Sequence, residues 1–172
     1  MKYPAFILVL LMFRPAYSQS GLSVVSSVDL NKYSGTWYEI ARLPAFFEKN
    51  LKCVTATYTK RSDGKITVLN KGHKIDDPSK ESSSTGVAWI PDSKSPAKLK
   101  VQFFWPFSGN YWILELDKDY KYVLVGDPSF KYLWILAREK TIDPQIYKML
   151  LEHAVKAGFD VSPIIKVDQD CK

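Results

Sequence analysis

Between Gly35 and Arg138, short segments of alternating apolar and polar residues follow one another at regular intervals. Residues that turn or break strands separate these segments, for example Asp63-Gly64 and Asp127-Pro128. Regular spacing of this kind predicts a β-sandwich or an up-and-down barrel. No helical pattern intervenes, so a parallel α/β sheet is not expected. The predicted strands cover residues 36–44, 52–60, 65–72, 83–90, 97–105, 110–116, 120–126 and 131–139.

The pattern changes after Arg138 and becomes helical. Asp143 and Pro144 are typical of the N-cap and the first turn of a helix, and Gly158 is typical of its end. Between them, apolar residues recur every three or four positions. They are Ile146, Met149, Leu150, His153, Ala154 and Ala157. We therefore expect one amphipathic helix that packs its apolar stripe against the outside of the strands.

The first residues have the pattern of a secretory signal peptide, predicted over 1–18. A basic residue, Lys2, precedes an apolar run over 5–13, and a small-residue cleavage signal follows at 16–18. The apolar run is too short for a membrane-spanning helix. Residues 19–172 would then form a single domain. Because no cysteine follows the apolar run as a lipid attachment site, we expect a soluble protein exported to the periplasm or the extracellular space.

The charge and the histidines argue against several classes of function. The formal net charge of +6 comes from scattered basic residues, so nucleic acid binding is not expected. His73 and His153 are the two histidines, and neither belongs to a nucleophile motif or a metal-ligand pattern. We therefore expect no enzyme activity, no catalytic residue, no metal and no cofactor. A haem ligated by His73 is an alternative for that loop residue.

The chain has two cysteines, Cys53 and Cys171. In an exported protein, an even pair of cysteines predicts a disulfide. It would close a loop that the chain-entropy model values at about 4–5 kcal/mol. Two free thiols or a link to another chain would also fit the sequence.

Three short motifs resemble the conserved regions of the lipocalins. They are Gly35-x-Trp37 at the start of the first strand, LDKDY (116–120) before the seventh, and Arg138 at the end of the eighth. The segments GTWYEIARLP, TATYTKRSDGKITVLNKG and DPSFKYLWILAR are more similar to the bacterial lipocalin and apolipoprotein D branch. The resemblance covers residues 29–171.

This resemblance implies a mainly β fold, an eight-stranded antiparallel up-and-down barrel with one C-terminal α-helix packed outside. It also implies that Gly35, Trp37 and Arg138 close one barrel end, with the guanidinium stacked on the indole. In this branch a cysteine of the second strand bonds to one in the C-terminal tail, which corresponds to Cys53–Cys171.

Strand alternation, counted from an inward-facing Trp37, predicts which side chains line the barrel interior. On the first strand it turns Glu39 and Ala41 inward. The small residues Ala56, Gly86 and Ala88 would leave room for a ligand. The alternative is that the inward-facing aromatic side chains simply fill the core. An apolar interior with a few polar groups is typical of a small-molecule site. The predicted ligand-binding residues are Glu39, Ala56, Tyr58, Val68, Asn70, Phe103, Trp112, Leu114, Tyr122, Leu124, Trp134 and Leu136. The family resemblance favours Tyr58, Trp112 and Trp134 among these.

Glu39 is the unusual residue of this set, because it is a carboxylate on a face expected to be buried. A catalytic acid would need a partner base, and the sequence shows none. Two interpretations remain. Glu39 is either a structural acid paired with a tyrosine hydroxyl, a buried water or an arginine, or it contacts the deep end of a ligand.

The loops at the opposite barrel end are rich in aromatic residues: Phe46, Phe47, Trp105, Phe107 and Phe130. Such a rim could contact a membrane or a dimer mate, or it could fold over the mouth as a lid. We expect a monomer or weak dimer that carries a hydrophobic or amphipathic ligand of the fatty acid or lysophospholipid class. The alternative is a closed barrel that presents its aromatic rim to a membrane or protein partner and carries no cargo.

Overall fold

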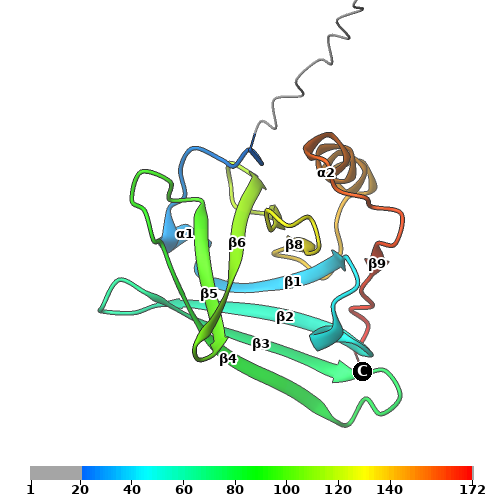
Figure 1. Cartoon of the computed structure of the whole chain (residues 1–172). Helices are drawn as coiled ribbons and strands as arrows, with labels where there is room; N and C mark the ends of the chain where they lie inside the picture. Colours follow the sequence, from blue (N-terminus) through cyan, green and yellow to red (C-terminus); the bar gives the residue numbers. More distant parts are fainter. Residues whose placement is uncertain (1–20, 172) are drawn as a thin grey trace, which may run out of the picture.

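The computed structural model describes residues 21–171, and an antiparallel sheet is their main regular structure (Figure 1). The helical elements are α1 (Leu30–Tyr33), η1 (Phe46–Glu48, one 3₁₀ turn) and α2 (Pro144–Ala157). The strands are β1 (Gly35–Arg42), β2 (Leu51–Lys60), β3 (Ile66–Lys74), β4 (Glu81–Trp89), β5 (Lys98–Phe104), β6 (Phe107–Leu116), β7 (Tyr122–Gly126), β8 (Leu133–Ala137) and β9 (Ile165–Lys166). The predicted signal peptide, residues 1–18, lies outside the described residues.

The sheet closes on itself because β1 pairs with both β8 and β2. From β2 to β8, each strand pairs antiparallel with the next one in the chain. The first half of β1 pairs with β2, from Gly35 opposite Tyr58 to Tyr38 opposite Thr55. Its second half pairs with β8 on one side and with β9 on the other. The predicted eight-stranded up-and-down barrel is therefore confirmed, with β9 as one additional strand.

Helix α2 lies outside the barrel, as predicted (Figure 1). The Asp143 side chain caps its first turn by accepting a hydrogen bond of 2.7 Å from the backbone N–H of Gln145. Gly158 ends it in the left-handed region, with φ of 105°. The buried faces of Leu150 and Ala154 pack against the outer side of the sheet.

The wall of the barrel separates two apolar clusters. The interior cluster is built around Tyr33, Trp37, Tyr58, Ile66, Val68, Ala88, Ala97, Leu99, Ile113, Val123, Val125 and Leu136. The outer cluster, between the sheet and α2, is built around Leu22, Ile40, Ala41, Leu43, Leu124, Leu133, Ile135, Ala137, Leu150, Ala154 and Phe159. Part of the wall is therefore apolar on both faces.

Two short helical elements, α1 and η1, are absent from the sequence-based prediction. Each is too short to show a helical period, and α1 is fixed by local bonds, including an Asp29 cap on the N–H of Asn31 (2.8 Å). The seventh strand begins at Tyr122 and not at Tyr120, whose φ of 59° places it in the preceding turn. Among the described residues, no helix has both the length and the apolarity needed to cross a membrane.

Candidate functional site

One end of the barrel is closed by Trp37 and Arg138. The guanidinium carbon of Arg138 lies 3.9 Å from the centre of a Trp37 ring. The same guanidinium donates hydrogen bonds to the carbonyl oxygens of Thr36 (2.9 Å), Lys32 (2.7 Å) and other residues of this segment. Gly35 has a φ of 96°, and a Cβ there would lie 3.2 Å from Arg138 Nη1. The structure therefore brings together the three residues expected to close the barrel.

Three tyrosines, Tyr33, Tyr58 and Tyr111, form a cluster next to this closure, and we call it the tyrosine floor. The Tyr111 hydroxyl lies 2.7 Å from that of Tyr33 and 2.8 Å from that of Tyr58. Trp37 Nε1 donates to the Tyr33 carbonyl oxygen at 2.8 Å. Burial raises the pKa of all three tyrosines, which keeps the hydroxyls neutral. Sequence reasoning selected Tyr58 as a ligand contact but missed Tyr33, which belongs to α1, and Tyr111.

Several predicted ligand-binding residues do face the interior. Those within or packed against the interior cluster are Ala56, Tyr58, Val68, Phe103, Trp134 and Leu136. Asn70 stands opposite Ala56 and Ser84, two positions beyond Val68 on β3, so alternation places it on the same face. The Oδ1 atom of Asn70 is buried and has no hydrogen-bond partner within residues 21–171. The role of these seven residues as ligand contacts stays a prediction.

Four other predicted ligand-binding residues lie on the opposite face of the wall, so the prediction that they line the interior is wrong. They are Trp112, Leu114, Tyr122 and Leu124, all part of or packed against the outer cluster. The interior positions of these strands belong to Tyr111, Ile113, Val123 and Val125. Because α2 covers the outer face of β6 and β7, both faces are apolar and alternation does not identify the inner one. A register shift between Ile113 and Glu115 further disrupts the alternation.

Two further expectations about the interior are also wrong. Ala41 packs in the outer cluster, because the register of β1 shifts between Glu39 and Ala41. Gly86 leaves no free volume, since a Cβ there would come within 2.8 Å of the Phe103 ring and 2.7 Å of the Gln102 carbonyl oxygen. The glycine is needed for the close packing of β4 on Phe103.

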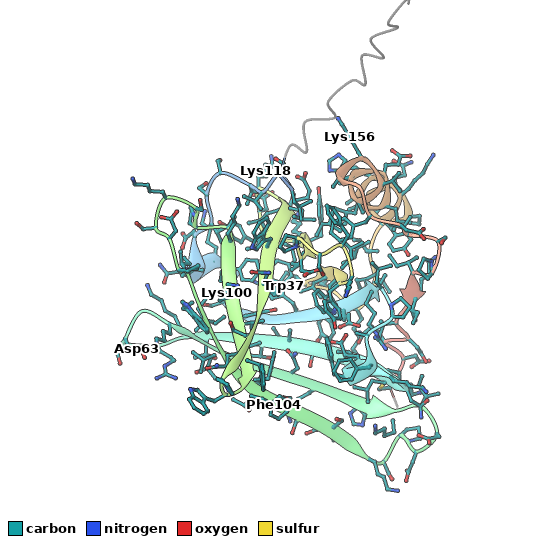
Figure 2. The ribbon with its side chains drawn as sticks, in the orientation of Figure 1. Trp37, Asp63, Lys100, Phe104, Lys118 and Lys156 are labelled. Atoms are coloured by element: carbon teal, nitrogen blue, oxygen red, sulfur yellow. A yellow bond between two sulfur atoms is a disulfide. The ribbon has the colours of Figure 1, made fainter. Side chains whose placement is uncertain are left out.

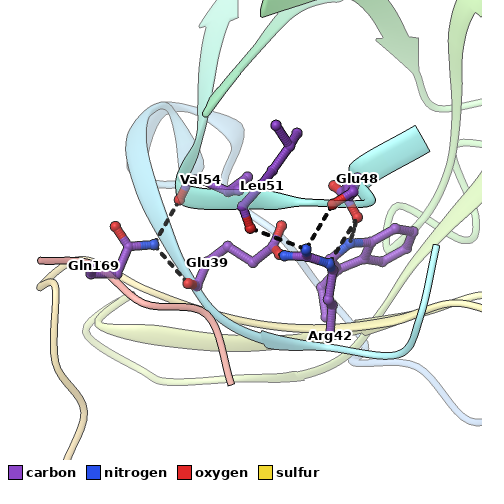
Figure 3. A network of polar contacts seen from close by, with 7 residues as sticks. Glu39, Arg42, Glu48, Leu51, Val54 and Gln169 are labelled. Atoms are coloured by element: carbon purple, nitrogen blue, oxygen red, sulfur yellow. Dashed lines mark hydrogen bonds and ion pairs between the residues drawn. The ribbon is translucent and has the colours of Figure 1, made fainter. Parts of the chain in front are cut away.

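The same register shift places Glu39 and Arg42 on the interior side, where they form a buried ion pair (Figure 3). Arg42 Nη1 donates to Glu39 Oε1 at 2.5 Å, and Arg42 Nη2 donates to the carbonyl oxygens of Glu48 (2.8 Å) and Leu51 (3.3 Å). Glu48 Oε2 lies 3.8 Å from Arg42 Nε and accepts a hydrogen bond of 3.1 Å from Trp134 Nε1. Of the partners considered for Glu39, the arginine is therefore the one found.

This network holds two carboxyl groups and one guanidinium. Burial, together with the nearby Glu48 carboxylate, raises the pKa of Glu39 to about 8, and Arg42 opposes the shift. Burial also raises the pKa of Glu48, against the hydrogen bond from Trp134 and the charge of Arg42. At neutral pH Glu39 therefore keeps its proton in the native state, beside the Arg42 guanidinium and the Glu48 carboxyl group. The sequence-based prediction missed Arg42, which a register shift in β1 turns inward, and Glu48, which lies in the 3₁₀ turn η1. Neither feature leaves a periodic signal in the sequence.

The C-terminal segment fills the gap where β1 and β2 diverge, and we call this gap the seam. Gln169 Nε2 donates to the carbonyl oxygens of Glu39 (2.8 Å) and Val54 (2.9 Å), one on each strand (Figure 3). The backbone N–H of Cys53 donates to the carbonyl oxygen of Asp168 at 2.7 Å. A disulfide joins Cys53 to Cys171, which confirms the predicted pairing.

Comparison with known proteins agrees with this architecture. A family model described as a lipocalin-like domain matches residues 28–169. The chain belongs to the lipocalin family. Among curated lipocalin relatives, outer membrane lipoprotein Blc of Escherichia coli (strain K12) is 44% identical over 149 residues, which cover 87% of this chain and 84% of that protein. Apolipoprotein D of Macaca fascicularis is 34% identical over 155 residues, which cover 86% of this chain and 80% of that protein.

These relatives place this lipocalin in the bacterial lipocalin and apolipoprotein D-like branch. Among solved structures, insecticyanin from the tobacco hornworm Manduca sexta superposes with a TM-score of 0.68 at 25% identity. That superposition covers 86% of this lipocalin and 84% of the insecticyanin chain. The resemblance inferred from the three short motifs is therefore confirmed.

The open end of this lipocalin barrel carries exposed aromatic side chains. The exposed fractions are 82% for Phe46, 86% for Trp105 and 78% for Phe107. Side chains folded over the mouth as a lid would have one face buried, so these three do not form a lid. Phe47 and Phe130 rest on neighbouring aromatic rings instead. Phe104, at the tip of the β5–β6 hairpin, adds a further exposed ring that the sequence reasoning did not include (Figure 2).

Proposed function

We propose that this lipocalin binds and carries a small hydrophobic or amphipathic molecule in its barrel interior. The observation that carries the proposal is apolar surface of the inner face that stays accessible. Inward-facing side chains such as Leu99 and Ile113 are buried. Ala56, Phe103 and Trp134, which also pack against the interior cluster, keep part of their surface accessible. An apolar surface that is accessible inside a barrel is suited to burying an apolar ligand.

The proposed ligand class is a fatty acid or a lysophospholipid. Burial of the acyl chain against the inner face would contribute about 25 cal/mol per Å² of apolar area. The polar groups of the interior include the hydroxyls of the tyrosine floor, Asn70 and the network of Glu39, Arg42 and Glu48. Arg42 donates to oxygens of Glu39, Glu48 and Leu51 and is buried, so we do not place an anionic headgroup on it. The headgroup would therefore stay near the mouth, with the chain directed toward the tyrosine floor.

Ligand titrations test the proposal, with calorimetry for affinity and tryptophan fluorescence for location. We expect fatty acids and lysophosphatidylcholine to change the emission of Trp134. Trp134→Phe removes that change, whereas Trp112→Phe, on the outer face, retains it. Absence of heat and of spectral change across a range of chain lengths would contradict the proposal.

Two substitutions on adjacent positions of β2 give a matched test of the cavity. Ala56→Phe places a ring on the inner face and should weaken binding at least about tenfold, by filling the space that the ligand needs. Thr57→Phe places the same ring on the outer face and should leave the affinity unchanged. Equal affinities of the two variants would show that the ligand binds elsewhere.

A second function, contact with a membrane surface during ligand transfer, is favoured by the exposed rings of Phe46, Trp105 and Phe107. Liposome co-sedimentation tests it. We expect Trp105→Ser combined with Phe107→Ser to reduce liposome binding, and Val155→Ser, an exposed apolar residue of α2, to leave it unchanged. Negligible liposome binding by the wild-type protein would contradict membrane contact.

We also infer that the protein acts outside the cytoplasm. The Cys53–Cys171 disulfide supports this, because such bonds persist in oxidising compartments. The signal-peptide pattern at residues 1–18 supports it independently. Fractionation of cells that express the full chain tests it, and recovery of a reduced, unprocessed protein in the cytoplasm would contradict it.

A further inference from the structure

A cavity lies beside the seam and outside the interior cluster, and we call it the seam cleft. It has a volume of about 530 Å³. Its lining comes mainly from the β1–β2 connection, residues 42–52, and from the C-terminal segment, residues 165–168, with Ile75 at one side. None of its lining residues belongs to the interior cluster. Its volume falls within the range of small-molecule sites.

The wall between the seam cleft and the interior is the ion pair of Arg42 and Glu48. Both residues line the cleft. On the interior side, Trp134 donates its indole N–H to the same Glu48 carboxyl group. Because Arg42 Nε lies 3.8 Å from Glu48 Oε2, the carboxyl group of this wall faces a cation and presents no unpaired acid to the cleft.

The other lining residues combine exposed apolar side chains with lysines. Phe46, Ile75 and Ile165 are all large, apolar and exposed. The cations other than Arg42 are Lys49, Lys52 and Lys166. The acid other than Glu48 is Asp168. Apolar surface beside an excess of positive charge is complementary to a molecule with an apolar chain and an anionic head.

Lys49 is the lysine best placed to meet such a head. Lys52 Nζ lies 3.7 Å from Asp168 Oδ2. Lys166 Nζ lies 4.8 Å from the centre of the Tyr147 ring. Lys49 is exposed and forms no ion pair within residues 21–171. Its ammonium group is a compact charge on a flexible stem, which can follow a headgroup at the cleft opening.

We propose that the seam cleft binds a single-chain anionic amphiphile, with its acyl chain against Phe46, Ile75 and Ile165 and its head at Lys49. The chemistry shared by the possible occupants is one carboxylate or phosphate on an unbranched chain. The inference uses no residue of the interior cluster, so it stands independently of the ligand proposed for the barrel.

Amide chemical-shift titrations of the full protein test this site with dodecyl phosphate and dodecanoate, below their micelle concentrations. We expect saturable shifts at the backbone amides of Lys49 and Val167 with at least one of the two, and the comparison identifies the preferred head. Dodecanol, which has no charge, should give no saturable shift at these amides. Shifts confined to interior residues such as Val101 and Ile113 would overturn the inference while supporting the proposed function.

Two charge-matched variants complete the test. Lys49→Gln removes an exposed cation and should weaken binding at the cleft about fivefold, the upper range for a solvent-exposed ion pair. Lys118→Gln removes a cation from the connection between β6 and β7, away from the cleft, and should leave it unchanged (Figure 2). Equal affinities of Lys49→Gln and the wild-type protein, or equal cleft shifts with dodecanol, would also overturn the inference.

Discussion

The proton that Glu39 retains in the network with Arg42 and Glu48 predicts an unusual dependence of stability on pH. Burial and the neighbouring Glu48 hold the pKa of Glu39 near 8 in the native state, against an ordinary value of 4.5. Between these values, the native state keeps a proton that the unfolded state has lost. The free energy of unfolding therefore falls as the pH rises through this interval, and it is highest below the ordinary pKa of a glutamic acid.

The size of this effect follows from the interval. Each pH unit between the two pKa values lowers the free energy of unfolding by about 1.4 kcal/mol per proton. Over the whole interval from 4.5 to about 8, the upper value is roughly 5 kcal/mol. The Glu39→Gln variant removes this term, because a neutral amide replaces the protonated carboxyl and still accepts from Arg42. The remaining Glu48 then faces Arg42 as a one-to-one pair.

Urea unfolding of the wild-type protein and Glu39→Gln at pH 5, 6, 7 and 8 measures the difference. We expect similar stabilities at pH 5 and a variant that is more stable by roughly 2–5 kcal/mol at pH 8. Glu81→Gln, which removes an exposed carboxylate paired with Lys71, should follow the wild-type pH profile. Parallel profiles for the wild-type protein and Glu39→Gln would refute the reasoning.

Three further substitutions probe the closed end, the seam and the packing of β4. Arg138→Ala should lower the free energy of unfolding by roughly 3–5 kcal/mol through loss of the cation–π contact and the charged hydrogen bonds, and Arg138→Lys should recover less than half in the same urea titration. Gln169→Ala leaves two carbonyls of the seam unpaired and should cost roughly 2–4 kcal/mol by thermal unfolding, whereas the exposed Asp170→Ala should be neutral. Gly86→Ala should cost about 1–3 kcal/mol by overpacking, and Gly109→Ala, whose Cβ would meet only one side chain at 3.9 Å, should change the same urea midpoint little. No difference within each pair would contradict the corresponding contact.

The direction of side chains could be predicted from the sequence wherever water covers the outer face of the wall. On β5, Lys98 and Lys100 alternate with Leu99 and Val101, and the structure has the apolar pair inside. On β6, Trp112 and Ile113 are both apolar because α2 provides a second apolar environment outside. Alternation then identifies two faces without indicating which one is the interior. The helix that causes the ambiguity was itself predicted, but the sequence did not indicate which strands it covers.

The polar part of the site was less predictable than the apolar part. Glu39 was identified because a carboxylate interrupts an apolar strand, yet its partner Arg42 was not. At spacing three, two residues of a regular strand point to opposite faces, and only the register shift on β1 brings them together. Gln169 acts through two backbone carbonyls more than a hundred residues away, and such contacts leave no pattern in the sequence.

The seam also bears on the order in which the barrel can fold. The two hydrogen bonds of Gln169 join positions 130 and 115 residues apart, and β9 pairs with β1 over a similar separation. Contacts this distant in the sequence close large loops and are expected to form late. Until the last residues emerge and dock, the second half of β1 and the start of β2 are free strand edges, which are templates for pairing with another chain. Newly made protein is therefore most exposed to self-association in the interval between formation of the strands and arrival of the C-terminal segment.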